Sequence, residues 1–218
     1  FADIDGDADL DVFVGNSDGK IIFSRNTGTV SAPVFAPATI NPFGLSDVGS
    51  YADPSLVDID GDADLDAFVS NSDGNILFFR NTGTISAPVF ASALMNPFGL
   101  SDAGGVFASI TLVDTDDDGD QDAFVGNVDG DTLYFKNTGT VNSPIFATAA
   151  FNPFGLNDVE SNASPAFADI DSDGDLDAFI GGRRLFTIPS VIFLPTMQSM
   201  CRLLSPPGKI PLAPDWIL

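Results

Sequence analysis

The strongest constraint in this sequence is a repeated block of about 55 residues. An acidic nine-residue segment begins at Asp3, Asp58, Asp114 and Asp169, so its copies are 55, 56 and 55 residues apart. Two other markers, Asn-Pro-Phe-Gly-Leu and Asn-Thr-Gly-Thr, each occur three times at the same spacing. A regular period of this length is typical of a repeat architecture, in which each unit packs against its neighbours.

Each unit is predicted to consist of short antiparallel strands. In the second copy, apolar runs precede and follow the acidic segment, and a third run, residues 75–79, comes after the turn at Asp73-Gly74. Asp-Gly between apolar runs indicates a hairpin in which both turn residues take positive φ. We expect a weaker fourth strand around residues 88–90. No segment has helical periodicity with caps. The period is too long for one coil of a β-helix, so we predict an all-β fold, a β-propeller of four-stranded antiparallel blades.

The repeat pattern divides the chain into two parts. Residues 1–182 carry the units that begin near residues 3, 58, 114 and 169, whereas residues 183–218 carry four of the 8 basic residues and one of the 31 acidic ones. We predict that residues 183–218 are foreign to the fold, as an out-of-frame or fused segment; the alternative is a divergent final blade. Because the chain begins with Phe1 rather than Met, we expect it to be part of a longer protein.

The composition excludes several classes of function. The 218 residues carry a net charge of −23, which argues against nucleic-acid binding and against docking on an anionic membrane. The absence of histidine removes Ser-His and Cys-His catalysis and the usual zinc sites. A lone cysteine, Cys201, allows no intrachain disulfide, and no apolar segment is long enough to insert in a membrane. A hydrophobic content of 44% is too high for a disordered acidic tail.

The acidic segments are the candidate sites. Each has aspartate at positions 1, 3, 5, 7 and 9: Asp3, Asp5, Asp7, Asp9 and Asp11; Asp58, Asp60, Asp62, Asp64 and Asp66; Asp114, Asp116, Asp118, Asp120 and Asp122; Asp169, Asp171, Asp173, Asp175 and Asp177. Carboxylates at this density repel one another unless a cation neutralises them. The oxygen-rich loop and the short Asp side chain suit Ca²⁺ better than Mg²⁺, with position 7 contributing its backbone carbonyl.

We therefore predict up to four Ca²⁺ ions, one for each loop. The loop is not an EF-hand, because position 12 is Val14, Val69, Val125 or Ile180 instead of glutamate. The alternatives are a solvated acidic surface loop and a catalytic carboxylate pair, as in glycosidases. Four copies of one active site are hard to reconcile with catalysis, so we predict that the chain is not an enzyme.

These residues resemble a known family. The loop at residues 169–177, followed by Ala178-Phe179-Ile180-Gly181, resembles the FG-GAP/VCBS-type repeat of integrin α-subunit propellers and of many secreted bacterial proteins. The resemblance extends over residues 1–182. It implies a calcium loop between the first and second strands of each blade. Because propellers in this family commonly have seven blades, it also implies that the present chain is an incomplete arc of a larger propeller; the alternative is a strained small propeller.

The sequence departs from the family pattern at loop position 6. The family favours glycine there, and Gly119 and Gly174 comply, whereas Ala8 and Ala63 occupy this position in the first two loops. Alanine tolerates positive φ poorly. We expect calcium in all four loops, and the alanines at position 6 bear on how tightly the first two loops bind it.

The resemblance implies a non-enzymatic, calcium-binding module of an extracellular or cell-surface protein, for adhesion or for binding a protein or glycan partner. The alternatives are a lectin-like propeller and an accessory domain of a larger secreted enzyme. We expect Phe13, Phe68, Phe124 and Phe179 to form the core between blades. The Asn-Pro-Phe-Gly-Leu segments are predicted to latch neighbouring blades together. Arg25, Arg80 and Lys136 hold one equivalent position and are expected to pair with nearby acids.

Overall fold

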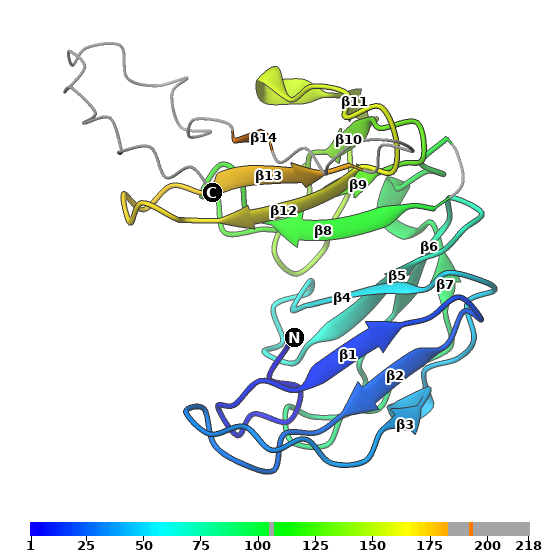
Figure 1. Ribbon diagram of the computed structural model, residues 1–218, viewed down its shortest axis with the longest axis vertical. Helices are drawn as coiled ribbons and strands as arrows, with labels where there is room; N and C mark the ends of the chain where they lie inside the picture. The colour runs from blue at the N-terminus through cyan, green and yellow to red at the C-terminus, as the bar shows by residue number, and fades with distance from the viewer. Residues whose placement is uncertain (105–106, 183–191, 194–218) are drawn as a thin grey trace, which may run out of the picture.

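The computed structural model describes residues 1–104, 107–182 and 192–193, and these residues are almost entirely β and irregular structure (Figure 1). The strands form four antiparallel sheets, one for each repeat. The second and third sheets have four strands each in chain order: β4 (Asp53–Val57), β5 (Asp66–Ser70), β6 (Ile76–Phe79) and β7 (Leu94–Met95); β8 (Ser109–Val113), β9 (Asp122–Gly126), β10 (Thr132–Phe135) and β11 (Ala150–Phe151). The predicted all-β class and the four-stranded antiparallel sheets are confirmed.

The first and fourth sheets have three strands each: β1 (Val12–Gly15), β2 (Ile21–Ser24) and β3 (Thr39–Ile40); β12 (Ser164–Ala168), β13 (Asp177–Gly181) and β14 (Ile192–Phe193). In the first repeat, a single bridge between Ala2 and Asp11 stands where the other repeats have their first strand. Residues 183–191 and 194–218 lie outside the described residues, and the prediction that residues 183–218 are foreign to the fold concerns mostly that segment. Between these two stretches, the backbone of β14 pairs with β13.

The sheets follow one another along an arc, and each packs its face against the next (Figure 1). Three apolar clusters fill the spaces between consecutive sheets and contain Phe13, Phe68 and Phe124 respectively. The second strand of each complete sheet is buried on both faces: all five residues of β5 and of β9 are buried, because neighbouring sheets cover both sides. The predicted core role of these three phenylalanines is confirmed, and Phe179 is half-buried in the last sheet.

The hairpin turns have the predicted positions but a different backbone. Positive φ occurs at Gly19, Gly74 and Gly130 and not at the aspartate before each of them, so the expectation for both residues is wrong. The asparagine at the end of the preceding strand supplies the reason. Its side-chain oxygen, at Asn71, accepts the backbone N–H groups of Asp73 and Asn75 at 3.0 and 3.1 Å. This closes a three-residue loop in which glycine alone adopts the left-handed conformation.

The fourth strand is not where the sequence indicated. It is β7 in the second repeat, whereas Phe90 forms only an isolated bridge with Asn81. The Asn81 side-chain oxygen accepts the N–H groups of Gly83 and Val89 at 3.0 and 2.9 Å. This folds residues 81–90 into a loop of their own before the chain returns to the sheet edge.

The Asn-Pro-Phe-Gly-Leu segments form single 3₁₀ turns that join neighbouring repeats: η1 (Pro42–Gly44), η2 (Pro97–Gly99) and η3 (Pro153–Gly155). The asparagine before each turn is left-handed, and Asn96 accepts the Ile76 N–H at 2.8 Å. The carbonyl of Phe98 accepts the N–H of Phe146, in the next repeat, at 2.7 Å. The carbonyl of Phe43 accepts the N–H of Phe90 at 2.8 Å in the same way, so the predicted latch is confirmed for the first two segments.

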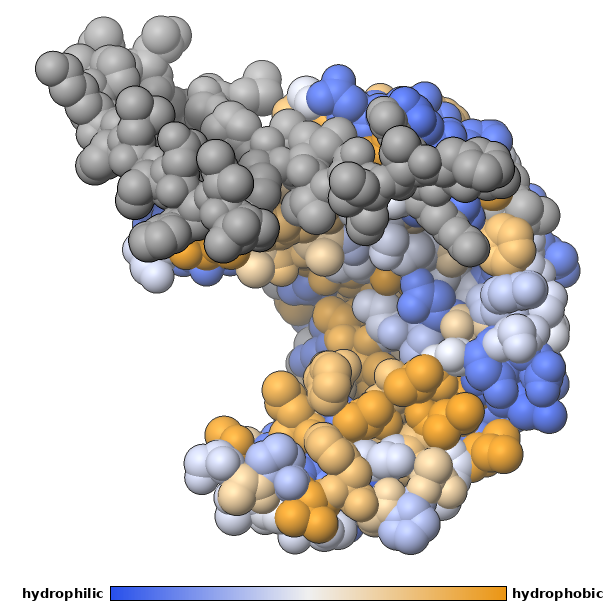
Figure 2. Space-filling model, viewed as in Figure 1, coloured by the Kyte–Doolittle hydropathy of each residue, from blue (hydrophilic) through white to orange (hydrophobic). Residues whose placement is uncertain are grey.

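The outer face of the first sheet is apolar and exposed. Figure 2 shows the curved body with hydrophobic residues gathered over the first sheet. Val14 is 50% exposed, whereas its equivalents Val69 and Val125 are fully buried. Phe35 is 44% exposed, whereas Phe90, its equivalent in the second repeat, is 5% exposed. In later repeats the preceding sheet covers this face.

Candidate metal centres

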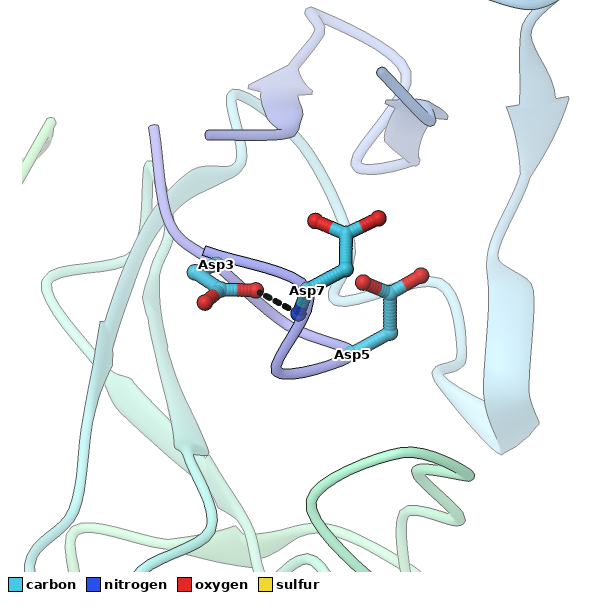
Figure 3. Close-up of side chains that lie close together, drawn as sticks. All are labelled: Asp3, Asp5 and Asp7. Atoms are coloured by element: carbon cyan, nitrogen blue, oxygen red, sulfur yellow. Dashed lines mark hydrogen bonds between the residues drawn. The ribbon is translucent and has the colours of Figure 1, made fainter. Parts of the chain in front are cut away.

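The acidic loops connect the first and second strands of their sheets. The second, third and fourth loops join β4 to β5, β8 to β9 and β12 to β13, and the first lies between Ala2 and Asp11. In each loop the first aspartate organises the backbone. Asp3 accepts the N–H groups of Asp7 and Ala8 at 3.1 and 2.9 Å, the first of which Figure 3 shows. Such bonds curl the loop around its own first carboxylate.

Every loop needs two left-handed residues, at positions 4 and 6. These are Gly61 (φ 71°) and Ala63 (φ 73°) in the second loop, but Ser172 (φ 63°) and Gly174 (φ 92°) in the fourth. Each loop therefore has one glycine and one strained non-glycine residue. The first two loops differ from the last two only in which of these positions holds the glycine. The alanine at position 6 in the first two loops does not change the shape of the backbone.

Carboxylate oxygens of three aspartates converge in each loop. The groups in which these oxygens all lie within 4.8 Å of one another are Asp3, Asp5 and Asp7; Asp58, Asp60 and Asp62; Asp114, Asp116 and Asp118; and Asp169, Asp171 and Asp177. Figure 3 shows the first group, in which the carboxylates of Asp5 and Asp7 lie close together. The other predicted ligands lie outside these groups: Asp9, Asp11, Asp64, Asp66, Asp120, Asp122, Asp173 and Asp175.

Aspartates both inside and outside these groups also contribute buried oxygens without a hydrogen-bond partner. In the first loop these are Asp5 Oδ1, Asp9 Oδ1 and Asp11 Oδ2, and in the second loop they are Asp60 Oδ1, Asp64 Oδ1 and Asp66 Oδ2. The same three positions, 3, 7 and 9, recur in both. A buried carboxylate oxygen without a partner is costly. A hard divalent cation, which takes several carboxylate oxygens at once, fits this donor set.

The next repeat buries these loops. The loop after β6 brings Ile85 against Gly6, where a Cβ atom would lie 3.0 Å from the Ile85 side chain. In the same way Asn142 of the third repeat reaches the second acidic loop, and its side-chain N–H₂ donates to the carbonyl of Asp60 at 2.8 Å. The second acidic loop is therefore in contact with a segment about 80 residues further along the chain.

In the first three loops, the aspartate at position 9 ties the loop to the end of the third strand. Asp11, Asp66 and Asp122 are each 1% exposed. Their Oδ1 atoms accept the backbone N–H groups of Asn26, Asn81 and Asn137 at 2.6, 2.6 and 2.7 Å. This contact explains why an aspartate is buried in the second strand.

In the third loop, side-chain hydroxyl groups donate hydrogen bonds to the second oxygen of the position-9 aspartate. The hydroxyl of Tyr134 donates to Asp122 Oδ2 at 2.9 Å, and the hydroxyl of Thr115 donates to the same oxygen. Sequence reasoning missed both residues. A signal in the sequence could have identified them. When the repeats are aligned by their acidic segments, Tyr134 and Thr115 bring hydroxyl groups to the positions of the apolar Phe78 and Ile59.

Burial and mutual repulsion make the loops resist full ionisation. Burial raises the pKa of Asp66 to about 7, and repulsion from Asp60 and Asp62 adds to the effect, although the Asn81 N–H opposes it. Burial also raises the pKa of Asp5, with the Arg25 guanidinium acting in the opposite direction. A bound cation would remove both penalties.

A basic residue at the end of the third strand contacts position 3 in three loops. Arg25 pairs with Asp5, Arg80 with Asp60 and Lys136 with Asp116. The prediction that these residues pair with neighbouring acids is confirmed.

No helix among the described residues is long and apolar enough to cross a membrane. No curated protein matches the sequence. Residues 3–69, which run from the first acidic loop into β5, match the model of the FG-GAP-like repeat family, so the resemblance that the sequence predicted is confirmed over that segment.

Proposed function

We propose that this chain is a calcium-stabilised, non-catalytic repeat module of an extracellular or cell-surface protein, serving adhesion or the binding of a protein or glycan. The recurrence of buried, unpartnered carboxylate oxygens at positions 3, 7 and 9 of the first two loops carries the proposal. The five aspartates of each loop would hold the ion, whose charge would offset their repulsion. Extracellular calcium suits loops of this kind, which need an affinity of only about 10⁻⁴–10⁻³ M.

The proposed architecture is an arc of a larger β-propeller. The face-to-face stacking of successive sheets along an arc supports it (Figure 1). The exposed Val14 and Phe35, whose equivalents in the following repeats are covered, also favour a further sheet on this face. Ser24 stands where Phe79 and Phe135 are buried, which makes the outer face less apolar than the inner ones.

Thermal unfolding of the full chain in millimolar CaCl₂, in MgCl₂ and in chelator tests the calcium proposal. A ligand at 100 times its Kd stabilises the folded state by about 2.7 kcal/mol for each site. For a chain of this size that corresponds to roughly 5–10 °C in Tm per site. We expect this rise with calcium and a smaller one with magnesium. Equal melting temperatures in calcium and chelator would refute a structural role for the ion.

A second candidate, a lectin-like function, is favoured by a cavity of about 370 Å³ at the start of β4, β8 and β12. It is lined by the rings of Tyr51 and Phe107, whose centroids are 4.5 Å apart, and by Asp53, Ser109 and Ser164. Aromatic faces beside carboxylate and hydroxyl groups are suited to a sugar ring. A glycan array with the wild-type chain and Tyr51→Ala tests this: selective glycan binding that the variant loses favours the lectin, and no binding excludes it.

A further inference from the structure

We propose that Arg25 and Arg80 are positioning residues of the first two metal centres, each holding one oxygen of the position-3 aspartate so that the other is presented to the cation. This inference rests on the calcium binding proposed above. It assigns these arginines a role in metal affinity that goes beyond neutralising an acidic loop.

The two oxygens of each position-3 carboxylate have different surroundings. Arg80 Nη2 lies 2.5 Å from Asp60 Oδ2 and 3.6 Å from Asp62 Oδ2, so one guanidinium group spans positions 3 and 5. Asp60 Oδ1 is buried and has no partner. Arg25 repeats the arrangement, with Asp5 Oδ2 in contact and Asp7 Oδ2 at 3.4 Å, while Asp5 Oδ1 is buried and unpartnered. A guanidinium fixed on Oδ2 restricts rotation of the carboxylate and so fixes Oδ1.

The first two loops also contain the other buried oxygens that a cation would need. In the second loop, Asp64 and Asp66 are 7% and 1% exposed, and each has one oxygen without a partner. The arginine takes none of these oxygens. Its contacts therefore leave the whole set of buried acceptors available, as expected of a residue that orients a ligand.

The third loop provides an internal comparison. There Lys136 contacts Asp116, whose side chain is 40% exposed, compared with 11% for Asp5 and 14% for Asp60. No oxygen of Asp116 is among the buried unpartnered atoms of the described residues. Lys136 contacts this carboxylate, whereas each arginine reaches the carboxylates at positions 3 and 5 through Nη2. Position 3 is more exposed in the loop that lacks the arginine.

A positioning role and a competing role predict effects of opposite sign. If the arginine only competed with the cation for the carboxylate, its removal would leave a more negative loop that binds Ca²⁺ more tightly. If it positions the carboxylate, its removal weakens binding despite the added negative charge. Loss of a group that orients a metal ligand typically lowers affinity about 10–100-fold.

The test is a Ca²⁺ titration of the ¹⁵N-labelled full chain, followed by NMR. Each loop has its own glycine amide as reporter: Gly6, Gly61, Gly119 and Gly174. In Arg80→Gln we expect the midpoint reported by Gly61 to rise about 10–100-fold, with the other three loops unchanged. Lys20→Gln, which removes the same charge from a hairpin turn, is the matched control and should leave all four midpoints unchanged.

Arg80→Lys retains the charge and is expected to raise the Gly61 midpoint by a smaller factor. It also carries the test if Arg80→Gln does not fold. An unchanged or lower midpoint at Gly61 in the arginine variants overturns the positioning role while leaving calcium binding intact. If no glycine signal responds to Ca²⁺ in the wild-type chain, the proposed function itself fails, and this inference fails with it.

Discussion

Replacing Asp66 by asparagine should stabilise the protein in chelator and destabilise it in calcium. Asp66 is 1% exposed, its Oδ1 accepts the Asn81 N–H at 2.6 Å, and its Oδ2 has no partner. An asparagine side chain retains the acceptor for Asn81 and removes the buried negative charge. In calcium the same change removes a ligand, so the sign of the effect should reverse.

The magnitude follows from the raised pKa. A rise from 3.8 to about 7 makes the ionised form of the folded protein less stable by about 4 kcal/mol. Relaxation and water penetration lower the cost of a buried charge in a folded protein, so we expect about 2 kcal/mol. The folded state binds a proton more tightly than the unfolded state. The stability of the calcium-free protein is therefore highest below pH 4 for this group and falls as the pH rises to about 7.

The assay is thermal unfolding in chelator at pH 5 and pH 8, then in calcium at pH 8. In chelator at pH 8, Asp66→Asn should raise Tm by roughly 4–8 °C, and at pH 5 by less, because there the wild-type carboxyl is mostly protonated. Asp73→Asn, an exposed change in the same repeat, is the control for net charge. A lower Tm for Asp66→Asn in chelator at pH 8 would refute the claim that this carboxylate is buried without compensation.

Three further changes test the fold and the loops. Ala63→Gly should raise stability by about 0.5–1 kcal/mol in chemical denaturation, because Ala63 has a φ of 73°. Tyr134→Phe should lower the Tm of the calcium-free protein by a few degrees, because Asp122 Oδ2 loses a donor at 2.9 Å; an unchanged Tm would contradict that role. Phe68→Ala should cost about 3–5 kcal/mol in denaturant unfolding, because this ring is fully buried between two sheets; a cost below 1 kcal/mol would contradict the packing described here.

Much of the fold could be predicted because its signals are local and repeated. The period places a sheet in each repeat, and an apolar run on both sides of each acidic loop places its first two strands. The fourth strand was mislocated because Pro88-Val89-Phe90 is as apolar as a strand. The course of residues 81–90 is set by the Asn81 side chain, whose oxygen accepts the N–H groups of Gly83 and Val89 and closes a loop. Propensity carries no information about such a bond.

The candidate sites could be predicted as loops but not as individual oxygen atoms. Alternating aspartates indicate a cation site whatever lies around them. Which oxygens are buried depends on the neighbouring repeat, since Ile85 packs against the first acidic loop and Asn142 against the second. The roles of Tyr134 and Thr115 arise within one repeat, where the fold brings both hydroxyls to Asp122.

The sequence by itself determined the all-β class, the repeat period, the aspartates of the four loops and the basic residues that pair with them. These depend on spacing along the chain, and a loop of nine residues is short enough for its own backbone to bring them together. The tertiary structure decided which carboxylates are buried and unpartnered, which of their oxygens an arginine holds, and how the third loop differs from the first two. These features arise when strands and neighbouring repeats pack together, so spacing along the chain alone does not specify them.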